Sequence, residues 1–217
     1  MEPFKTHRGM IAPLDRSNID TDQIIAKQFL KSIARTGFGP QLFYDWAHNA
    51  DGSLNKEFSL NNLIYKGASI LIAGNNFGCG SSREHAVWAI AQYGFRAVIA
   101  LSSLMGSELI PGFADIFKNN CGKNGVVTVE LPMKDYQELL SEIKKNKDKA
   151  LEMTVDLSGQ KIILHAAGGD ITKKFEYDQA VKDRLLNGLD DIGITLKHED
   201  ALKAFEAKHD AQISFHG

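Results

Sequence analysis

Apolar and polar residues alternate with different periods along the chain, and its first part contains short apolar runs separated by helical patterns. The runs have the length of strands and cover residues 10–14, 68–73, 97–100 and 126–131. Residues 68–73 have the sequence ASILIA, and a continuous apolar run of this length is typical of a strand that is covered on both faces. We therefore expect a sheet of largely buried strands in this part.

Helical spacing occurs between these runs and after them. Residues 24–33 place Ile25, Phe29 and Ile33 four positions apart on one face, which predicts a helix. The sequence GFGP at residues 37–40 ends it. Further helices are predicted over residues 82–93, 135–143, 177–188 and 198–208.

The pattern changes after about residue 150. Residues 153–164 alternate apolar and polar positions on both sides of Ser158-Gly159, which indicates a β-hairpin with a tight turn. Strands alternating with helices, followed by antiparallel strands, predict a mixed α/β fold. We expect one domain over residues 1–217 with a C-terminal helical extension from about residue 177, whose last helix has Leu202 and Phe205 on its apolar side.

The composition narrows the classes of function. The 217 residues include 25 basic and 27 acidic ones, 43% are hydrophobic, and the net charge is −2. This excludes a disordered chain, which needs low hydrophobicity and high net charge, and a strongly basic nucleic-acid-binding domain. The N-terminal residues lack the apolar segment of a signal peptide, and the apolar runs are shorter than the ~20 residues of a membrane span. We expect a cytoplasmic protein that binds neither nucleic acid nor membrane.

The cysteines limit the cofactors that this chain can hold. Cys79 and Cys121 are too few for a disulfide framework or a four-thiolate cluster. Neither a C-x-x-C pair nor a Cys/His run with the spacing of zinc ligands occurs. We expect two reduced thiols and no metal site in this chain.

Candidate chemistry lies in the segment NFGCGSSREHA at residues 76–86, between an apolar strand and a helix. Gly74, Gly78 and Gly80 let the backbone approach a ligand closely, and the helix directs its free N–H groups at that position. Arg83 adds a positive charge with a geometry suited to a carboxylate. The segment lacks the lysine of a phosphate-binding loop and the third glycine of a dinucleotide-binding loop. It therefore predicts a site for another kind of anion.

A local structural role competes for the same residues. Ser81 and Glu84 have the spacing of a capping box, in which each side chain bonds the backbone N–H of the other. That role leaves Ser82 and Arg83 unexplained, and the charge of Arg83 opposes the helix dipole at this end. A residue placed against its local preference is typical of a functional site. We interpret His85 as a packing residue and not as a ligand.

The segment GCGSSREHA closely resembles the signature of the small, swivelling domain of the aconitase superfamily. Further segments resemble the small subunits of bacterial 3-isopropylmalate dehydratases, namely LDRSNIDTDQII (14–25), RTGFG (35–39), LFYDW (42–46), FADIFKNNC (113–121) and LNGLDDIGITL (186–196). The resemblance covers residues from about 5 to about 208. It implies the swivelling β/β/α domain of this superfamily.

The resemblance also implies a function, that of a hydro-lyase subunit in leucine biosynthesis. Such enzymes interconvert 2-isopropylmalate and 3-isopropylmalate through 2-isopropylmaleate, and the small subunit is active only with a large subunit, in a heterodimer or a higher assembly. The large subunit is expected to carry a [4Fe–4S] cluster on three cysteines, which a chain with two distant cysteines does not supply. The implied partners are the large subunit and a small di- or tricarboxylate substrate.

Five residues receive roles from the resemblance. Ser81 matches the base that removes the proton α to a carboxylate, and Arg83 with the helix N-terminus would favour its alkoxide. Ser82 would help to hold the substrate, and Arg35 matches an arginine that binds a substrate carboxylate. Asp22 matches an aspartate that orients such an arginine through a charge-assisted pair, although by itself it equally suits a helix N-cap.

One segment departs from the family pattern. The family usually runs from VIAPSF directly into ADIF, whereas here residues 101–110 (LSSLMGSELI) form an apparent insertion. The segment follows a predicted strand end, where α/β sheets place their ligands. It would lengthen a loop near the substrate or the partner, or form a surface excursion, and its apolar residues indicate that it packs on something.

Two other functions stay open on the sequence alone. One is the small subunit of a related hydro-lyase of the citraconate/methylmalate or homoaconitate type, because substrate choice rests on a few loop residues. The other is a non-catalytic, carboxylate-binding assembly subunit in which residues 101–110 block the site. Replacement of Ser81 by alanine separates the catalytic functions from the non-catalytic one.

Overall fold

The structure is a computed structural model, which describes residues 1–31, 34–80, 83–146, 148–196 and 199–209. Ser81 and Ser82 lie outside the described residues. The strands are β1 (Thr6–Leu14), β2 (Ile70–Ala73), β3 (Ala97–Met105), β4 (Glu108–Ile110), β5 (Val127–Pro132), β6 (Glu152–Asp156), β7 (Lys161–His165) and β8 (Ile171–Lys174). The α-helices are α1 (Thr21–Ile24), α2 (Tyr44–Ala47), α3 (Glu84–Tyr93), α4 (Asp115–Asn124), α5 (Met133–Lys145), α6 (Gln179–Asn187), α7 (Asp191–Leu196) and α8 (Glu199–His209). Short 3₁₀ helices are η1 (Lys27–Lys31), η2 (Gly39–Gln41), η3 (Ser59–Asn61) and η4 (Leu63–Tyr65).

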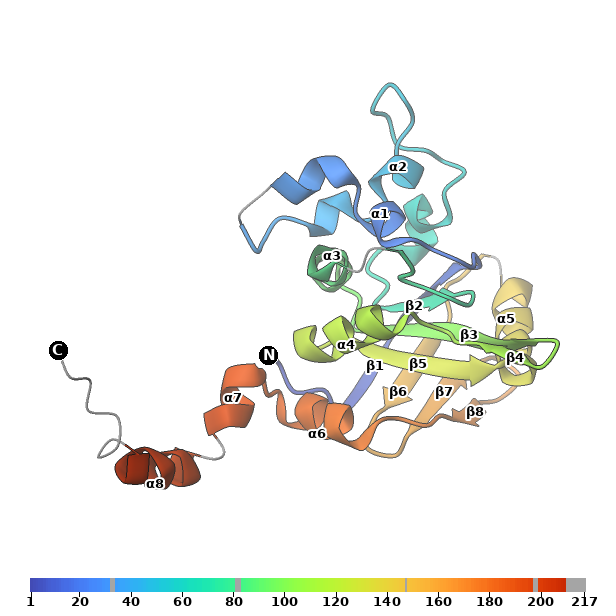
Figure 1. Cartoon of the computed structure of the whole chain (residues 1–217). Helices are drawn as coiled ribbons and strands as arrows, with labels where there is room; N and C mark the ends of the chain where they lie inside the picture. The colour runs from blue at the N-terminus through green and yellow to red at the C-terminus, as the bar shows by residue number, and fades with distance from the viewer. Residues whose placement is uncertain (32–33, 81–82, 147, 197–198, 210–217) are drawn as a thin grey trace.

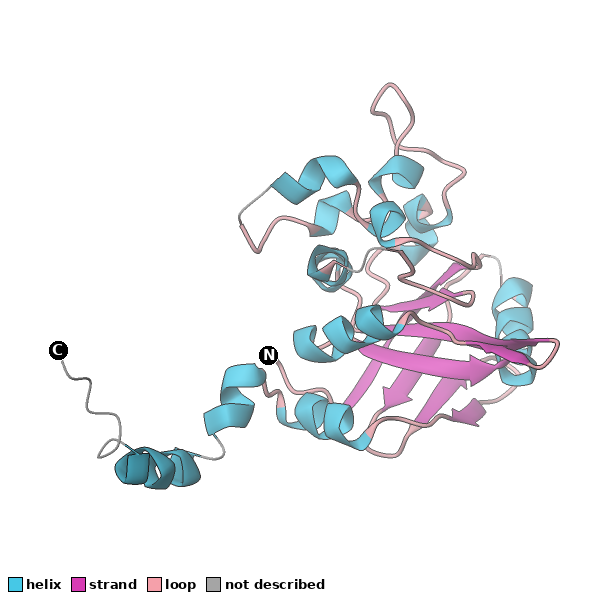
Figure 2. Cartoon of the chain, in the orientation of Figure 1, coloured by secondary structure: helices cyan, strands magenta, loops and turns pink. Residues whose placement is uncertain are grey.

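These strands join one mixed sheet in the order β4-β3-β2-β1-β6-β7-β8, with β5 also beside β3. The pairs among β1, β2, β3 and β5 are parallel, whereas β6, β7 and β8 pair antiparallel. β1 joins the two halves, because residues 11–14 pair with β2 and residues 6–10 pair with β6. Figure 2 shows the helices arranged around this sheet. The predicted α/β fold and the predicted hairpin at residues 153–164 are confirmed.

The sheet is buried on both faces, as the apolar run in β2 predicts. Leu71 and Ala73 lie in one hydrophobic core, and Ile70 and Ile72 lie in the other. The first core also holds side chains from α1, α3 and α4, and the second holds side chains from α5, α6 and the β6–β7 hairpin. Successive strand residues point to opposite faces, so one short strand contributes to both layers.

The single helix predicted over residues 24–33 is wrong. α1 ends before Ile25, which has an extended backbone and pairs with Leu42, and η1 follows. Ile25 is fully buried, so its tertiary contacts outweigh the helical spacing of the sequence. Its branched Cβ also favours an extended backbone over a helix. Ile33 lies outside the described residues.

Residues 101–110 form a β-hairpin. β3 continues beyond the predicted strand end, turns at Gly106 and returns as β4, which projects beyond the sheet in Figure 1. Gly106 has a φ of +64°, a backbone conformation that glycine adopts readily in two-residue hairpin turns. Leu104 and Leu109 are cross-strand partners and are 71% and 62% exposed. The described chain does not cover this pair, so the prediction that the apolar residues of this segment pack on something stays a prediction.

The C-terminal helices differ in how closely they pack. Leu185 of α6 is fully buried, and Gly188 ends that helix with a φ of +65°. Leu202 and Phe205 of α8 are both exposed, so the apolar side predicted for this helix is not buried by the described chain. Figure 1 shows α8 apart from the sheet. Of the helices in the described part of the chain, none has the length and apolar content that a membrane crossing requires.

Candidate active site

The glycine-rich segment leaves the carboxyl end of β2 and leads to α3. Gly78 and Gly80 have φ values of +76° and +83°, which disfavour other residues. A Cβ atom at Gly78 would collide with the ring of Phe117, and one at Gly80 would collide with the carboxylate of Asp20. Both positions therefore require glycine for conformation and for close approach.

Backbone hydrogen bonds tie this segment to the loop that precedes α1. The N–H of Gly78 donates to the carbonyl of Ile19 at 2.8 Å, and the N–H of Thr21 donates to the carbonyl of Cys79 at 3.0 Å. Two segments that are distant in the sequence thus form one rigid support. Asp22 and Arg83 come from its two sides.

Asp20 caps α1 and leaves the Asp22 carboxylate to other partners. The N–H of Asp22 donates to Asp20 Oδ1 at 2.7 Å, and the N–H of Asp20 donates to Gln23 Oε1 at 2.9 Å, which completes a capping box. The local alternative for Asp22, a helix N-cap, is therefore wrong, because Asp20 holds that position.

An ion pair joins Asp22 to Arg83. Arg83 Nη1 lies 3.0 Å from Asp22 Oδ1, and the two side chains are 29% and 31% exposed. Both atoms are buried, and neither has a geometrically aligned hydrogen bond to a described residue. Lys27 Nζ lies 3.2 Å from the other carboxylate oxygen, but its side chain is largely exposed. The charge of Asp22 thus holds the guanidinium of Arg83 at this position.

Arg83 stands at the N-terminus of α3. The helix begins at Glu84, and Arg83 occupies the N-cap position without a side-chain capping bond. Glu84 Oε1 instead accepts a hydrogen bond from Asn124 Nδ2 at 3.1 Å. Glu84 is therefore the first helical residue and not the third, so the capping box predicted for Ser81 and Glu84 is wrong. The first N–H groups of α3 lack intrahelical partners and add a positive field beside the arginine.

Arg35 belongs to the loop before η2, and its side chain lies beside α3. Its guanidinium carbon is 5.7 Å from the centroid of a Trp88 ring, and the residue is exposed. His85 packs against the rings of Trp88 and Phe38 at centroid distances of 4.7 and 5.2 Å, as expected of a packing residue. The structure therefore places Arg83 at the start of α3 and Arg35 over its second turn.

Comparison with known proteins decides the family. A family model described as the aconitase C-terminal domain matches residues 1–134, and a model of the C-terminal domain of the 3-isopropylmalate dehydratase small subunit matches residues 191–212. A protein of Bacillus subtilis named 3-isopropylmalate dehydratase small subunit is 48% identical over 98% of this chain and 99% of its own. The chain belongs to the family of 3-isopropylmalate dehydratase small subunits.

Other family members support the same assignment. Proteins of the same name from Desulforapulum autotrophicum and Halalkalibacterium halodurans are 49% and 51% identical over 96% and 95% of this chain, and over 96% and 98% of theirs. A crystal structure titled 3-isopropylmalate dehydratase from Methanocaldococcus jannaschii matches with a TM-score of 0.58 and 23% identity. The match covers 93% of this chain and 99% of that one, and it shows that the fold is the swivelling domain of the aconitase superfamily.

The residues of this small-subunit family member do not fit an iron–sulfur cluster as ligands. Burial raises the pKa of Cys121 well above its ordinary value, and burial together with the charge of Asp20 raises the pKa of Cys79. Cysteine ligates metal as the thiolate, which these surroundings disfavour. Within the described part of the chain, no group of three or more His, Cys, Asp and Glu side chains is placed to hold a metal ion.

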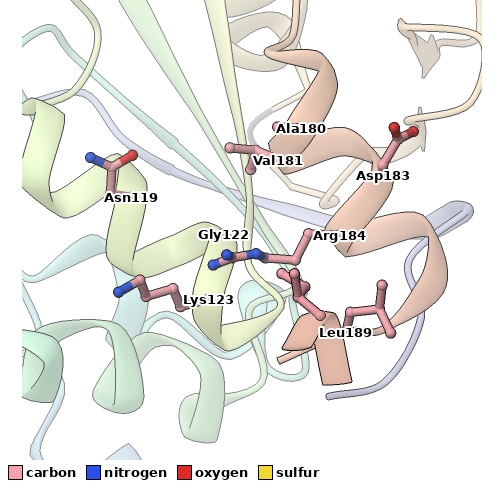
Figure 3. Close-up of a pocket in the computed structure, with 9 residues that line it drawn as sticks. Asn119, Gly122, Lys123, Ala180, Val181, Asp183, Arg184 and Leu189 are labelled. Carbon is pink, nitrogen blue, oxygen red and sulfur yellow. The ribbon is translucent and has the colours of Figure 1, made fainter. Parts of the chain in front are cut away.

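A cavity of about 540 Å³ lies elsewhere on this family member, between α4 and α6. Figure 3 shows its lining, in which Lys123 and Arg184 accompany smaller aliphatic side chains. None of the described site residues (Asp22, Arg35, Arg83) lines it. The candidate active site therefore does not coincide with this cavity.

Sequence reasoning missed two residues that support the site. Gln92 bonds two backbone groups of the loop that carries Arg35, and Asn124 joins the side chains of Glu84 and Trp88. These hydrogen bonds span between 36 and 57 positions of sequence. No local spacing indicates contacts over such separations.

Proposed function

We propose that this chain works in the cytoplasm as the small subunit of 3-isopropylmalate dehydratase, which interconverts 2-isopropylmalate and 3-isopropylmalate in leucine biosynthesis. The observation that carries the proposal is the Asp22–Arg83 ion pair at the N-terminus of α3, adjoining Ser81 and Ser82 in the sequence. A fixed cation and free helix N–H groups at one place favour an anionic group. A malate with two carboxylates and an acidic proton beside one of them suits this arrangement.

In the proposed reaction, Ser81 is the base. Its alkoxide oxygen takes the proton from the carbon α to a carboxylate, the hydroxyl on the neighbouring carbon leaves with its bonding electrons, and a C=C bond forms. Hydroxide then adds to the carbon that had lost the proton, and Ser81 returns its proton to the carbon that had carried the hydroxyl, which gives the isomer and restores the alkoxide. A serine hydroxyl is a weak base, so the positive field of Arg83 and the α3 N-terminus must lower its pKa.

The substrate carboxylates require cations at two places. Arg83 follows the proposed base by two positions in the sequence, and its guanidinium is held by the carboxylate of Asp22. Arg35 offers an exposed guanidinium over the ring of Trp88, one to two turns along the same helix. We propose that Arg35 binds a carboxylate and that Ser82 assists in holding the substrate.

The site is proposed to be shared with a large subunit that carries a [4Fe–4S] cluster. This is supported by the small-subunit names of the relatives and by the lack of a metal-ligand group among the described residues of this chain. The chain then contributes proton transfer and carboxylate binding to a heterodimer or a larger assembly.

Replacement of Ser81 by alanine tests the proposal. In the assembled enzyme, we expect isopropylmalate turnover to fall by at least about two orders of magnitude, the scale of general base catalysis. Binding of the large subunit should be unchanged. Ser141→Ala, at an exposed position of α5, is the matched control and should retain full turnover. Unchanged turnover of Ser81→Ala would exclude Ser81 as the base. If the assembled enzyme turned over a citraconate-type or homoaconitate-type substrate in place of isopropylmalate, the substrate assignment would be excluded.

A further inference from the structure

The loop that carries Arg35 is fastened to α3 by one side chain. Gln92, near the C-terminal end of α3, donates from Nε2 to the carbonyl of Arg35 at 2.8 Å. Its Oε1 accepts from the N–H of Phe38 at 2.9 Å. A glutamine amide has a donor and an acceptor side by side, so it can hold a C=O and an N–H of the same loop at once.

Packing holds the C-terminal side of this loop to the same helix. Phe38 is 2% exposed and meets the ring of His85 edge-on at 5.2 Å. Gly39 approaches the helix so closely that a Cβ atom there would collide with the backbone carbonyl of Gln92. Phe38 and Gly39 thus lie against α3, whereas Thr36 and Gly37, between them and Arg35, are exposed to solvent.

On that side, two contacts between described residues attach Arg35 to α3. One is the hydrogen bond from Gln92 to its carbonyl, and the other is the position of its guanidinium over Trp88. The Trp88 ring is itself held, because its Nε1 donates to Asn124 Oδ1 at 3.0 Å. The guanidinium can lie over this ring only while the backbone of Arg35 stays near α3, and Gln92 fixes that backbone.

The same helix also sets Arg35 relative to Arg83. Arg83 occupies the N-cap of α3, and Trp88 lies five residues further on, about 7.5 Å along the axis at 1.5 Å per residue. Because Trp88 belongs to α3, the position of Arg35 over its ring ties both arginines to the same helix. Two cations held by one helix suit a substrate with two carboxylates.

We propose that Gln92 is a positioning residue, which holds Arg35 in register with Arg83 so that the two can bind the carboxylates of one substrate molecule. The inference rests on the proposed function, because it requires that Arg35 binds substrate. Both hydrogen bonds of the Gln92 side chain to described residues go to the backbone of the loop, so Gln92 acts through Arg35 and affects substrate binding more than the chemical step.

The test uses steady-state kinetics of the assembled enzyme with isopropylmalate. Gln92→Met keeps the length of the side chain but removes both hydrogen bonds, and we expect KM to rise about tenfold, the scale of two neutral hydrogen bonds, with kcat within about twofold. Gln137→Met, an exposed glutamine on α5, is the matched control and should change neither constant.

A double variant distinguishes positioning from general stability. If Gln92 acts through Arg35, adding Gln92→Met to Arg35→Ala should raise KM no further. If Gln92→Met raised KM equally in the wild-type chain and in Arg35→Ala, the inference would be overturned. A large rise in KM for Arg35→Ala with no rise for Gln92→Met would also overturn it. A normal KM for Arg35→Ala would instead contradict the proposed role of Arg35.

Hydrogen exchange tests the hydrogen bonds between Gln92 and the loop without an activity assay. In the small subunit by itself, Gln92→Met should accelerate exchange of the Phe38 amide by about tenfold, because its acceptor is lost. Gln137→Met should leave that amide unchanged. Equal exchange of the Phe38 amide in all three proteins would show that Gln92 does not fasten the loop.

Discussion

The guanidinium of Arg83 at the N-cap of α3 lies 3.0 Å from the carboxylate of Asp22 in α1, and the segments that lead into these two helices share backbone hydrogen bonds. Asp20 supplies the cap of α1, so the carboxylate of Asp22 is not used for capping. The pair fixes a cation at the start of α3, where an anion is also favoured by the helix. This arrangement leads to the first prediction.

Asp22→Asn should lower kcat/KM of the assembled enzyme by about ten- to a hundredfold, because a partly buried ion pair contributes more than an exposed one. The variant keeps the shape of the side chain but removes the charge that holds Arg83. Lys27→Met removes the other cation near Asp22 and should have little effect, because exposed ion pairs contribute little. Similar kinetics for Asp22→Asn and the wild-type chain would show that the pair has no role in catalysis.

Gly80→Ala should destabilise the chain by more than the cost of a left-handed alanine, because the added Cβ would collide with the carboxylate that caps α1. Gly37→Ala is the matched control. Its φ of +94° is also left-handed, but nothing lies within 4 Å of the added atom. Denaturant unfolding should give a larger loss for Gly80→Ala, by about 1 kcal/mol or more. Equal losses would mean that the contact with Asp20 does not constrain this position.

The exposed pair on the β3–β4 hairpin should contribute little to the stability of the chain by itself. Leu104→Thr with Leu109→Thr is expected to change the free energy of unfolding by less than about 0.5 kcal/mol, as for other surface substitutions. Leu71→Ala, at a fully buried position of β2, should cost about 2–5 kcal/mol. A loss of that size for the hairpin variant would indicate that the hairpin packs against the chain.

Alkaline pH should destabilise the fold through buried tyrosines. Burial raises the pKa of Tyr177 to about 12, and burial with the charge of Asp15 raises the pKa of Tyr136. The unfolded chain loses these protons near pH 10, whereas the folded chain retains them. The stabilising contribution is therefore complete below about pH 10 and decreases as the pH rises toward about 12 for Tyr177. Urea unfolding between pH 8 and 11 should show this decrease, and Tyr177→Phe should reduce its slope; an unchanged slope would contradict the assignment.

Most of the secondary structure follows from local sequence patterns. Buried strands and amphipathic helices leave periodic apolar positions, and β2, the β6–β7 hairpin and α6 are found where these patterns predict them. The elements that the sequence does not predict, such as β8 and α4, have weak periodic patterns of apolar residues. β8 has the sequence ITKK, and α4 contains asparagine and glycine, which have low helix propensity. The break at Ile25 depends on its pairing with Leu42, which is a tertiary contact.

In the candidate site, too, some features follow from the local sequence and others depend on tertiary contacts. The glycines and the arginine of the segment at residues 78–83 indicate an anion site from the sequence, because their conformational and electrostatic properties are local. The partners of these residues are not local: Asp20 meets Gly80, Asp22 meets Arg83, and Gln92 holds the loop of Arg35. Such contacts depend on how the sheet brings loops together, which residue spacing does not encode.

The most direct measurement is isopropylmalate dehydration by this chain alone and by the chain mixed with a cluster-loaded large subunit prepared anaerobically. If the active site is shared between two subunits, the chain alone should be inactive and the mixture should form 2-isopropylmaleate. Activity of the chain alone would contradict a shared site. A stable complex without activity on isopropylmalate would contradict the proposed reaction.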